Sequence, residues 1–192
     1  MPALILSLGA VSVLSLFAPV VWADQPIGIK SYVLGSTMSA FYHFEDTKWI
    51  EDCDTRRLPA ALVCQNVTDG ENKGLNWYIS VAGEDCYVGH LSFTSTEGGM
   101  YEDWPLYDFA IWCEWGSSWE RVKSALTSKY GETTGDMEDW VRGSQRISLI
   151  EYPSRLRLPT GERMTGTLIS VVDERLKTAV ENLENELRDA DI

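Results

Sequence analysis

The chain has 192 residues and carries 16 lysine and arginine residues against 29 aspartate and glutamate residues, a formal net charge of −13. This balance argues against a nucleic-acid-binding protein, because contacts with phosphates need clustered Lys and Arg. A hydrophobic fraction of 44% and an aromatic fraction of 11% argue against disorder and are sufficient for the core of a folded domain.

The first residues have the pattern of a signal peptide. Residues 3–22 contain no charged side chain, and Val21 and Ala23 place small residues at the third and first positions before a cleavage site. We therefore predict a signal peptide over residues 1–23 and a single mature domain over residues 24–192. The segment lacks an N-terminal Lys or Arg, and an apolar run of about 20 residues is also long enough for a retained membrane anchor. With cleavage, we expect a periplasmic or secreted protein without a membrane span.

The four cysteines form an even set, which predicts two disulfides in an exported protein. Four cysteines allow three connectivities, and we favour Cys53–Cys64 with Cys86–Cys113 because each closes a local loop. A zinc site with cysteine ligands is the alternative to the two disulfides. However, the spacings contain no CxxC pair and neither histidine lies near a cysteine pair, so we predict no metal and no cofactor.

A strand and a short helix are predicted at the start of the mature chain. Apolar residues alternate between Ile27 and Gly35, as is typical of a strand. Ser36 or Thr37 is suited to cap a short helix, whose apolar face comprises Met38, Phe41 and Tyr42. The charged residues 45–57 predict a loop.

Four strands of one antiparallel sheet are predicted next. The first covers residues 62–67, and in the other three the apolar side chains alternate with polar ones, which predicts one buried face. The residues expected on that face are Leu75, Trp77, Ile79 and Val81, then Tyr87, Gly89, Leu91 and Phe93, then Tyr107, Phe109, Ile111 and Trp115.

The second half of the chain predicts a helix, a hairpin and a final helix. Ser117 and Glu120 form a capping-box pattern, and Gly131 supplies a stop signal for a helix with its apolar face at Trp119, Val122, Leu126 and Tyr130. Strands over residues 145–152 and 165–172 are joined by a turn at residues 159–161. A charged C-terminal helix carries an apolar stripe that either packs on its own sheet or forms a short coiled coil: Leu176, Val180, Leu183 and Leu187.

This element order predicts an α+β fold, with an antiparallel sheet, a few short helices and a C-terminal helix. Each half of the chain contains a short helix followed by strands. A duplicated helix-plus-sheet unit is therefore an alternative description of the same fold.

Two segments, residues 28–37 and the Ala125–Gly131 helix end, resemble small exported proteins of Gram-negative bacteria that have no assigned function. In those proteins an LG turn opens a short helix, and an LxxKYG helix end precedes a strand that contains Trp, here Trp140-Val141. Glu132 stands where that family usually has Pro. The resemblance implies an envelope location and an α+β fold, and it implies no catalytic residues.

Residues suited to catalysis form no recognisable motif. Neither His43 nor His90 lies in a nucleophile motif, and no GxSxG is present. The acids clustered between Glu45 and Asp54 could serve glycoside hydrolysis, but nothing in the sequence distinguishes a buried acid from an ionised base. The pairs Asp52/Asp54 and Asp69/Glu71 match no EF-hand loop. We predict no catalytic site, so an enzyme is the less favoured interpretation.

One region combines acidic and aromatic residues. From Gly74 to Glu120 the sequence contains no Lys or Arg, and it contains eight acids and eleven aromatic residues. Such a composition suits a cationic partner, through charge steering and aromatic anchors. The residues predicted to contact the partner are Tyr101, Glu102, Asp103, Trp104, Asp108, Trp112 and Glu114. The alternative is that helices cover Trp112 and that the acids pair within the fold with Arg142, Arg146, Arg155 and Arg157.

Two functions are consistent with these features. The first is a non-enzymatic envelope protein that binds a basic protein or peptide, for instance an inhibitor or immunity factor. The second is a small envelope hydrolase or a carbohydrate-binding module. The sequence does not determine the oligomeric state.

Overall fold

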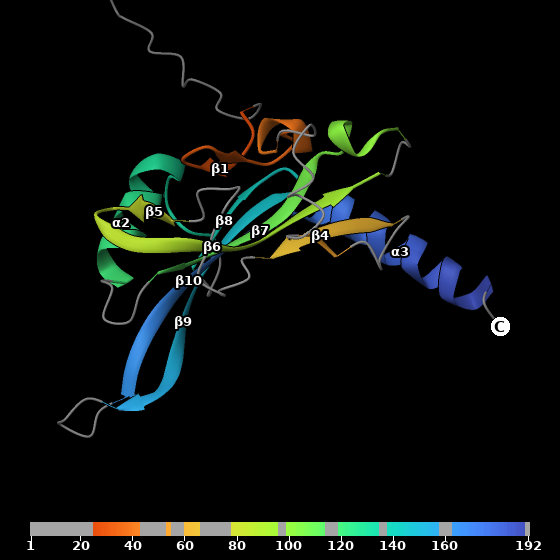
Figure 1. Ribbon diagram of the computed structural model, residues 1–192. Helices are drawn as coiled ribbons and strands as arrows, with labels where there is room; N and C mark the ends of the chain where they lie inside the picture. Colours follow the sequence, from red (N-terminus) through yellow and green to blue (C-terminus); the bar gives the residue numbers. More distant parts are fainter. Residues whose placement is uncertain are drawn as a thin grey trace, which may run out of the picture.

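The computed structural model describes residues 25–42, 53–54, 60–65, 78–95, 99–113, 119–134, 138–157 and 163–190. For residues 153–157, 163 and 164 the description covers the backbone alone. The chain adopts the predicted α+β fold, in which an eight-stranded antiparallel sheet carries a two-stranded sheet and α-helices (Figure 1).

The large sheet is built from local meanders. In spatial order its strands run β3-β4-β6-β7-β10-β9-β8, and β5 pairs with β6 beside this path. Each half of the chain supplies a three-strand meander, β4-β6-β7 and β8-β9-β10, and the halves meet where β7 pairs antiparallel with β10. A duplicated helix-plus-sheet unit would produce this arrangement. The strands are β3 (Cys53–Asp54), β4 (Ala61–Gln65), β5 (Tyr78–Val81), β6 (Glu84–Thr94), β7 (Leu106–Cys113), β8 (Asp139–Arg142), β9 (Gln145–Arg157) and β10 (Arg163–Asp173).

The N-terminal segment forms a hairpin rather than the single strand predicted from Ile27 to Gly35. Strands β1 (Gly28–Ile29) and β2 (Tyr32–Val33) are joined at Lys30, which has a positive φ of 57°. A positive φ reverses the chain direction within a two-residue turn, and alternation of apolar residues alone does not reveal such a turn. The short helix predicted next is the 3₁₀ helix η2 (Met38–Ala40).

The first face of the sheet is covered by β1, β2, η2 and helix α2 (Trp119–Tyr130). The apolar face predicted for α2 is confirmed, since Val122 and Leu126 are buried and Trp119 and Tyr130 pack against the same core. This core also includes Ile27, Met38, Phe93, Phe109, Ile111, Trp140, Ile147 and Ile169.

The predicted odd-numbered buried face of β6 is confirmed for Leu91 and Phe93 and wrong for the first half of the strand, where Tyr87 and Gly89 are not buried. Pairing with β7 shifts between Val88 and His90, so Gly89 is the extra residue of a β-bulge. A bulge reverses which side chains point to each face beyond it. The buried side chains therefore change from even to odd numbers along β6: Cys86, Val88, Leu91 and Phe93.

A second register shift places Tyr107 on the face opposite to the one predicted for it. On β7 this residue is the extra one, because Asp108 pairs with Ser92 while Leu106 pairs with Phe93. Tyr107 therefore points to the second face and leaves the set formed by Phe109 and Ile111. Its neighbours in the core are Ala60, Ala61 and Val180.

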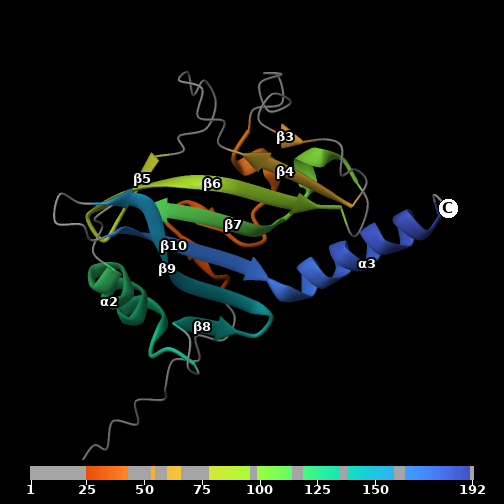
Figure 2. The ribbon, with the colours of Figure 1, turned by 90° about the horizontal axis from the view of Figure 1, so that it is seen from below.

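Helix α3 (Glu174–Ala190) covers one end of the second face and then runs beyond the sheet (Figure 2). Val180 is buried against the sheet, with Leu176 and Leu183 beside it. The prediction that the stripe packs on its own sheet is confirmed for this half of the helix, whereas Leu187 is 38% exposed. Along the rest of the second face, no described helix crosses β6, β7, β10 and β9 in Figure 2.

The two predicted disulfides form, and both join paired residues on neighbouring strands. Cys53 bonds to Cys64 and Cys86 to Cys113. Two disulfides are typical of an oxidising compartment. Cys53 and Asp54 form β3 inside the segment predicted as a loop, because they pair with β4.

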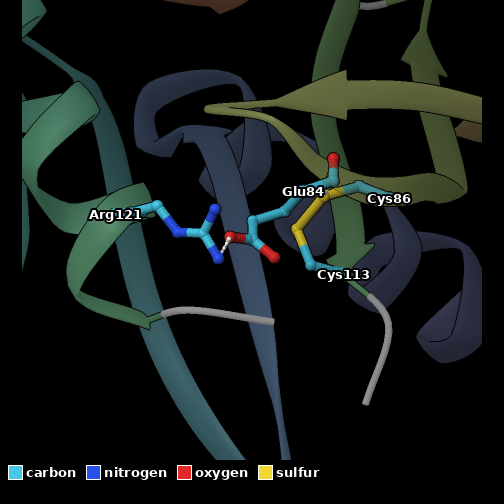
Figure 3. The surroundings of a disulfide bond; sticks show 4 residues. All are labelled: Glu84, Cys86, Cys113 and Arg121. Atoms are coloured by element: carbon cyan, nitrogen blue, oxygen red, sulfur yellow. Dashed lines mark hydrogen bonds and ion pairs between the residues drawn. A yellow bond between two sulfur atoms is a disulfide. The ribbon is translucent and has the colours of Figure 1, made fainter. Parts of the chain in front are cut away.

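The second disulfide lies beside an ion pair that connects α2 to the sheet. Figure 3 shows Arg121 extending from α2 toward Glu84, with Nη2 2.8 Å from the Glu84 Oε1 atom. The Glu84 side chain is 10% exposed and that of Arg121 is 65% exposed. The ion pair thus joins a mostly buried carboxyl group to an arginine whose side chain is largely exposed.

Several predicted features lie outside the described residues: the cleavage site, His43, Trp77, Glu114, Trp115 and Ser117. Among the described residues, no helix has the length and apolar character needed to cross a membrane.

Candidate functional site

A row of large side chains crosses the second face of the sheet. Strand pairing places Tyr78 opposite Tyr87, Tyr87 opposite Trp112, Trp112 opposite Leu168 and Leu168 opposite Ile150. Directly paired residues point to the same face, so these five side chains form one row across the sheet. Three of them are aromatic and two are aliphatic, and we call the set the aromatic row. Tyr78 is 63% exposed and Ile150 is 42% exposed, while the three between them are half-buried.

Neighbouring residues on the strands fix the direction of this row. Phe109 and Ile111 on β7, and Ile147 and Leu149 on β9, point into the core of the first face. Since side chains alternate along a strand, Trp112 and Ile150 must point the other way.

Two glycines seat aromatic rings against the backbone beside the row. A Cβ atom at Gly89 would lie 2.4 Å from Nε1 of Trp112, and one at Gly166 would lie 2.5 Å from Cζ of Tyr152. Both glycines therefore leave room that the two rings occupy. The Trp112 and Tyr152 rings also contact each other edge to face, with centroids 4.7 Å apart and planes at 81°.

Tyr152 extends the aromatic surface toward the end of the β9–β10 hairpin. Its partner across the hairpin is Gly166, the residue next but one to Leu168. Burial, and secondly the nearby Tyr87, raise the pKa of Tyr152 above its ordinary value. The phenol is therefore neutral at neutral pH, the form that can both donate and accept a hydrogen bond.

The row is flanked by small side chains on the side toward α3. Ala110 pairs with Ser170, and Ser170 pairs with Ser148. One further step along the strands, Asp108 pairs with Val172 and Val172 with Arg146. The large side chains of the row therefore stand beside a lower strip of the sheet.

A cavity of about 330 Å³ lies between the sheet and α3. On its floor, Nε2 of His90 lies 3.0 Å from Oδ2 of Asp108. The predicted residue Asp108 thus engages a histidine that the sequence did not associate with it. The cavity is lined by Val63, Gln65, His90, Ser92, Tyr107, Asp108, Lys177, Val180, Glu181 and Glu184.

Among the described side chains of the second face, negative charge predominates. Its Arg146 is already engaged, since it pairs with Asp139 at 3.9 Å and with Glu174. Among the described residues near the row and the cavity, Lys177 adds one cation, against the acids Asp85, Asp108, Asp139, Glu174, Glu181 and Glu184.

The structure divides the predicted partner-binding set. Trp112 and Asp108 lie on the second face, whereas Tyr101, Glu102 and Asp103 form the 3₁₀ helix η4 (Tyr101–Asp103) before the opposite end of β7. The six residue steps from Leu106 to Trp112 correspond to about 20 Å along a strand. The predicted set therefore does not form one continuous surface.

Trp104 is buried rather than exposed. It is 4% exposed, belongs to the core of the first face and packs edge to face against Tyr101 at 4.9 Å. Asp103 and Trp104 also line a separate cleft of about 670 Å³ near the start of α3. Pro105 follows Trp104, and the Trp104 carbonyl accepts a hydrogen bond from the Met38 amide, so contacts with η2 draw this residue into the core.

Most of the aromatic row was not identified from the sequence. A signal did exist, because Ile150 and Tyr152 are apolar residues at even positions of a strand whose odd positions, Ile147 and Leu149, supply the core. Large apolar residues on the face opposite to the core indicate either a covering element or a binding surface.

The described residues contain no cluster of three or more His, Cys, Asp and Glu side chains that could hold a metal ion. His90 is hydrogen-bonded to Asp108, and among the described residues no hydrogen bond joins this histidine to a hydroxyl or thiol nucleophile. In the predicted carboxylate cluster, Asp54 lies on β3 and is half-buried, and the other four acids lie outside the described residues: Glu45, Asp46, Glu51 and Asp52.

Comparison of the chain with protein-family models, with curated proteins and with solved structures finds no match.

Proposed function

We propose that this chain is an exported, non-enzymatic binding protein that docks a basic protein on the second face of its sheet. The observation that carries the proposal is the aromatic row, which remains partly exposed in direct register across β5, β6, β7, β10 and β9. Tyr and Trp are enriched among the residues that dominate protein interfaces. An inhibitor or immunity factor for a basic hydrolase or toxin is a form of this function.

Charge favours a basic partner over a second copy of the chain. The net charge is −13, so two copies repel each other at long range, whereas a basic protein is attracted. The exposed Asp85, two residues before Tyr87 on β6, and the exposed Glu181 of α3, at the neighbouring cavity, add local complementarity.

Ring geometry favours a protein over a glycan. Trp112 and Tyr152 are inclined at 81°, so the two rings together do not form one flat platform for stacking along a sugar chain. An irregular surface of this kind suits the side chains of a protein.

The test compares variants of the mature protein, residues 24–192, for binding of a basic protein purified from envelope extract by affinity. Tyr78→Ser and Trp112→Ala should each weaken binding, and the dissociation constant should rise steeply with salt. Met100→Ser is a matched control, because Met100 is 67% exposed but lies beside η4. The proposal fails if Tyr78→Ser and Trp112→Ala bind as Met100→Ser does. Binding that tolerates salt and is released by soluble sugars would instead favour the carbohydrate-binding alternative.

A further inference from the structure

The cavity beneath α3 adjoins the docking surface. Its floor residues Ser92 and Asp108 lie on the same sheet face as Trp112, and Ala110 separates Asp108 from Trp112 along β7. A protein that covers the aromatic row therefore approaches the mouth of this cavity.

The lining combines apolar walls with carboxylates. Val63, Tyr107 and Val180 provide the apolar part. Asp108 on the sheet and Glu181 and Glu184 on α3 provide three carboxylates, which outnumber the one lysine of the lining, Lys177. Lysine and arginine have the complementary form, an aliphatic stem with a cationic end. The volume of about 330 Å³ is sufficient for such a side chain.

The polar groups of this lining are incompletely paired. Ser92 is 3% exposed, and within the described part of the chain its hydroxyl, directed to the cavity side of β6, has no hydrogen-bond partner. Glu181 and Glu184 form no ion pair with a described cation, Lys177 included. This hydroxyl can therefore accept a hydrogen bond from a donor that enters the cavity.

We propose that this cavity receives one lysine or arginine side chain of the basic partner. The inference rests on the proposed function, because it identifies the partner's cationic anchor. The cation would lie between Asp108 and the two glutamates of α3 and would donate hydrogen bonds to their carboxylates and to Ser92.

The first experiment uses the protein without a partner. Butylguanidinium, with an apolar stem and a cationic end, is titrated while the imidazole resonances are followed by NMR. The sequence contains two histidines, and the resonance lost in His90→Gln belongs to His90. We expect a saturable shift of this resonance with a dissociation constant in roughly the millimolar range, and no such shift with the uncharged analogue butylurea.

The second experiment measures affinity for the purified basic partner. Glu184→Gln and Glu181→Gln should each weaken binding roughly fivefold, because each removes a charge-assisted contact in a partly screened site. Glu186→Gln is the matched control, since it makes the same change at an exposed position of α3 that does not line the cavity.

Two results would overturn the inference. One is an equal response of His90 to butylurea and butylguanidinium, or no response to either. The other is that Glu184→Gln and Glu181→Gln bind as Glu186→Gln does while Tyr78→Ser still weakens binding, in which case the docking face stands without this anchor. Failure of the proposed function itself is recognised separately, by unchanged binding of Tyr78→Ser and Trp112→Ala.

Discussion

The indole of Trp112 lies on the backbone of Gly89, at a position where a Cβ atom would come within 2.4 Å of Nε1. Gly89 is also the bulged residue of β6. The bulge therefore does two things at once: it reverses the faces of β6, and it places a residue without a side chain under the largest ring of the row. Fold and candidate site depend on the same glycine.

Gly89→Ala should destabilise the protein by about 1–3 kcal/mol, the cost of forcing extra volume into a packed site. Urea unfolding followed by circular dichroism measures this change. The cause is tested by a double-mutant cycle, because the penalty should largely disappear when Trp112 is already alanine. Additive effects of Gly89→Ala and Trp112→Ala would show that the ring does not cause the cost.

Trp104 and Trp112 should respond differently to truncation. Trp104 is 4% exposed within the main core, so Trp104→Ala should cost about 3–5 kcal/mol of unfolding free energy. Trp112 is half-buried, and Trp112→Ala should cost about 1–2 kcal/mol while weakening partner binding. Equal losses of stability in the two variants would contradict this assignment.

The two disulfides should differ in their contribution to stability. Cys86–Cys113 closes a separation of 27 residues and Cys53–Cys64 one of 11 residues. The chain-entropy relation then gives about 3.5 and about 2.8 kcal/mol, respectively. Paired Cys→Ser replacements test this order by chemical denaturation, and thiol titration of the unfolded, unreduced protein should detect no free thiol.

The two partners of the Glu84–Arg121 ion pair should differ in how much stability is lost when each is replaced. Arg121→Gln leaves the mostly buried Glu84 carboxylate without its cation, so we expect a loss of about 1–2 kcal/mol of unfolding free energy. Glu84→Gln removes the buried charge and leaves an arginine that is 65% exposed, so its cost should be smaller. The order is read from urea unfolding, and the opposite order would contradict the burial argument.

Alkaline pH should weaken the fold through two phenols, those of the buried Tyr32 and the half-buried Tyr152. Burial raises the pKa of Tyr152 and also that of Tyr32. A raised pKa in the folded state means that the folded protein holds these protons more tightly than the unfolded chain does. The resulting stability is complete below about pH 10, the ordinary value of tyrosine, and is lost as the pH rises through the folded-state pKa.

Tyr152→Phe tests the sign of this effect. The variant should show a shallower fall of unfolding free energy above pH 10 than the wild type, and its tyrosinate absorbance titration should lose a component with a raised midpoint. Tyr78→Phe is the control, because Tyr78 is exposed. An equal fall in all three proteins would contradict a contribution from Tyr152.

Local patterns in the sequence were sufficient for much of the fold. Helical spacing placed Val122 and Leu126 on the buried side of α2, and the stop signal at Gly131 coincides with a positive φ of 90°. The favoured cysteine pairing is also the observed one, because both bridges join neighbouring elements. These features depend on residues close in the chain, where propensity and spacing act directly.

Tertiary structure alone decided which residues meet on the candidate surface. Strand pairing brings Tyr78, Trp112 and Ile150 into one row, although they are far apart in sequence. One-residue bulges moved Gly89 and Tyr107 out of the pattern that alternation predicted, and contacts with η2 buried Trp104. Alternation specifies two faces of a strand, but its phase resets at every bulge, and the order of strands depends on contacts between distant segments. The sequence thus determined an acidic, aromatic α+β domain with two local disulfides, and the register of its sheet decided where the aromatic surface lies.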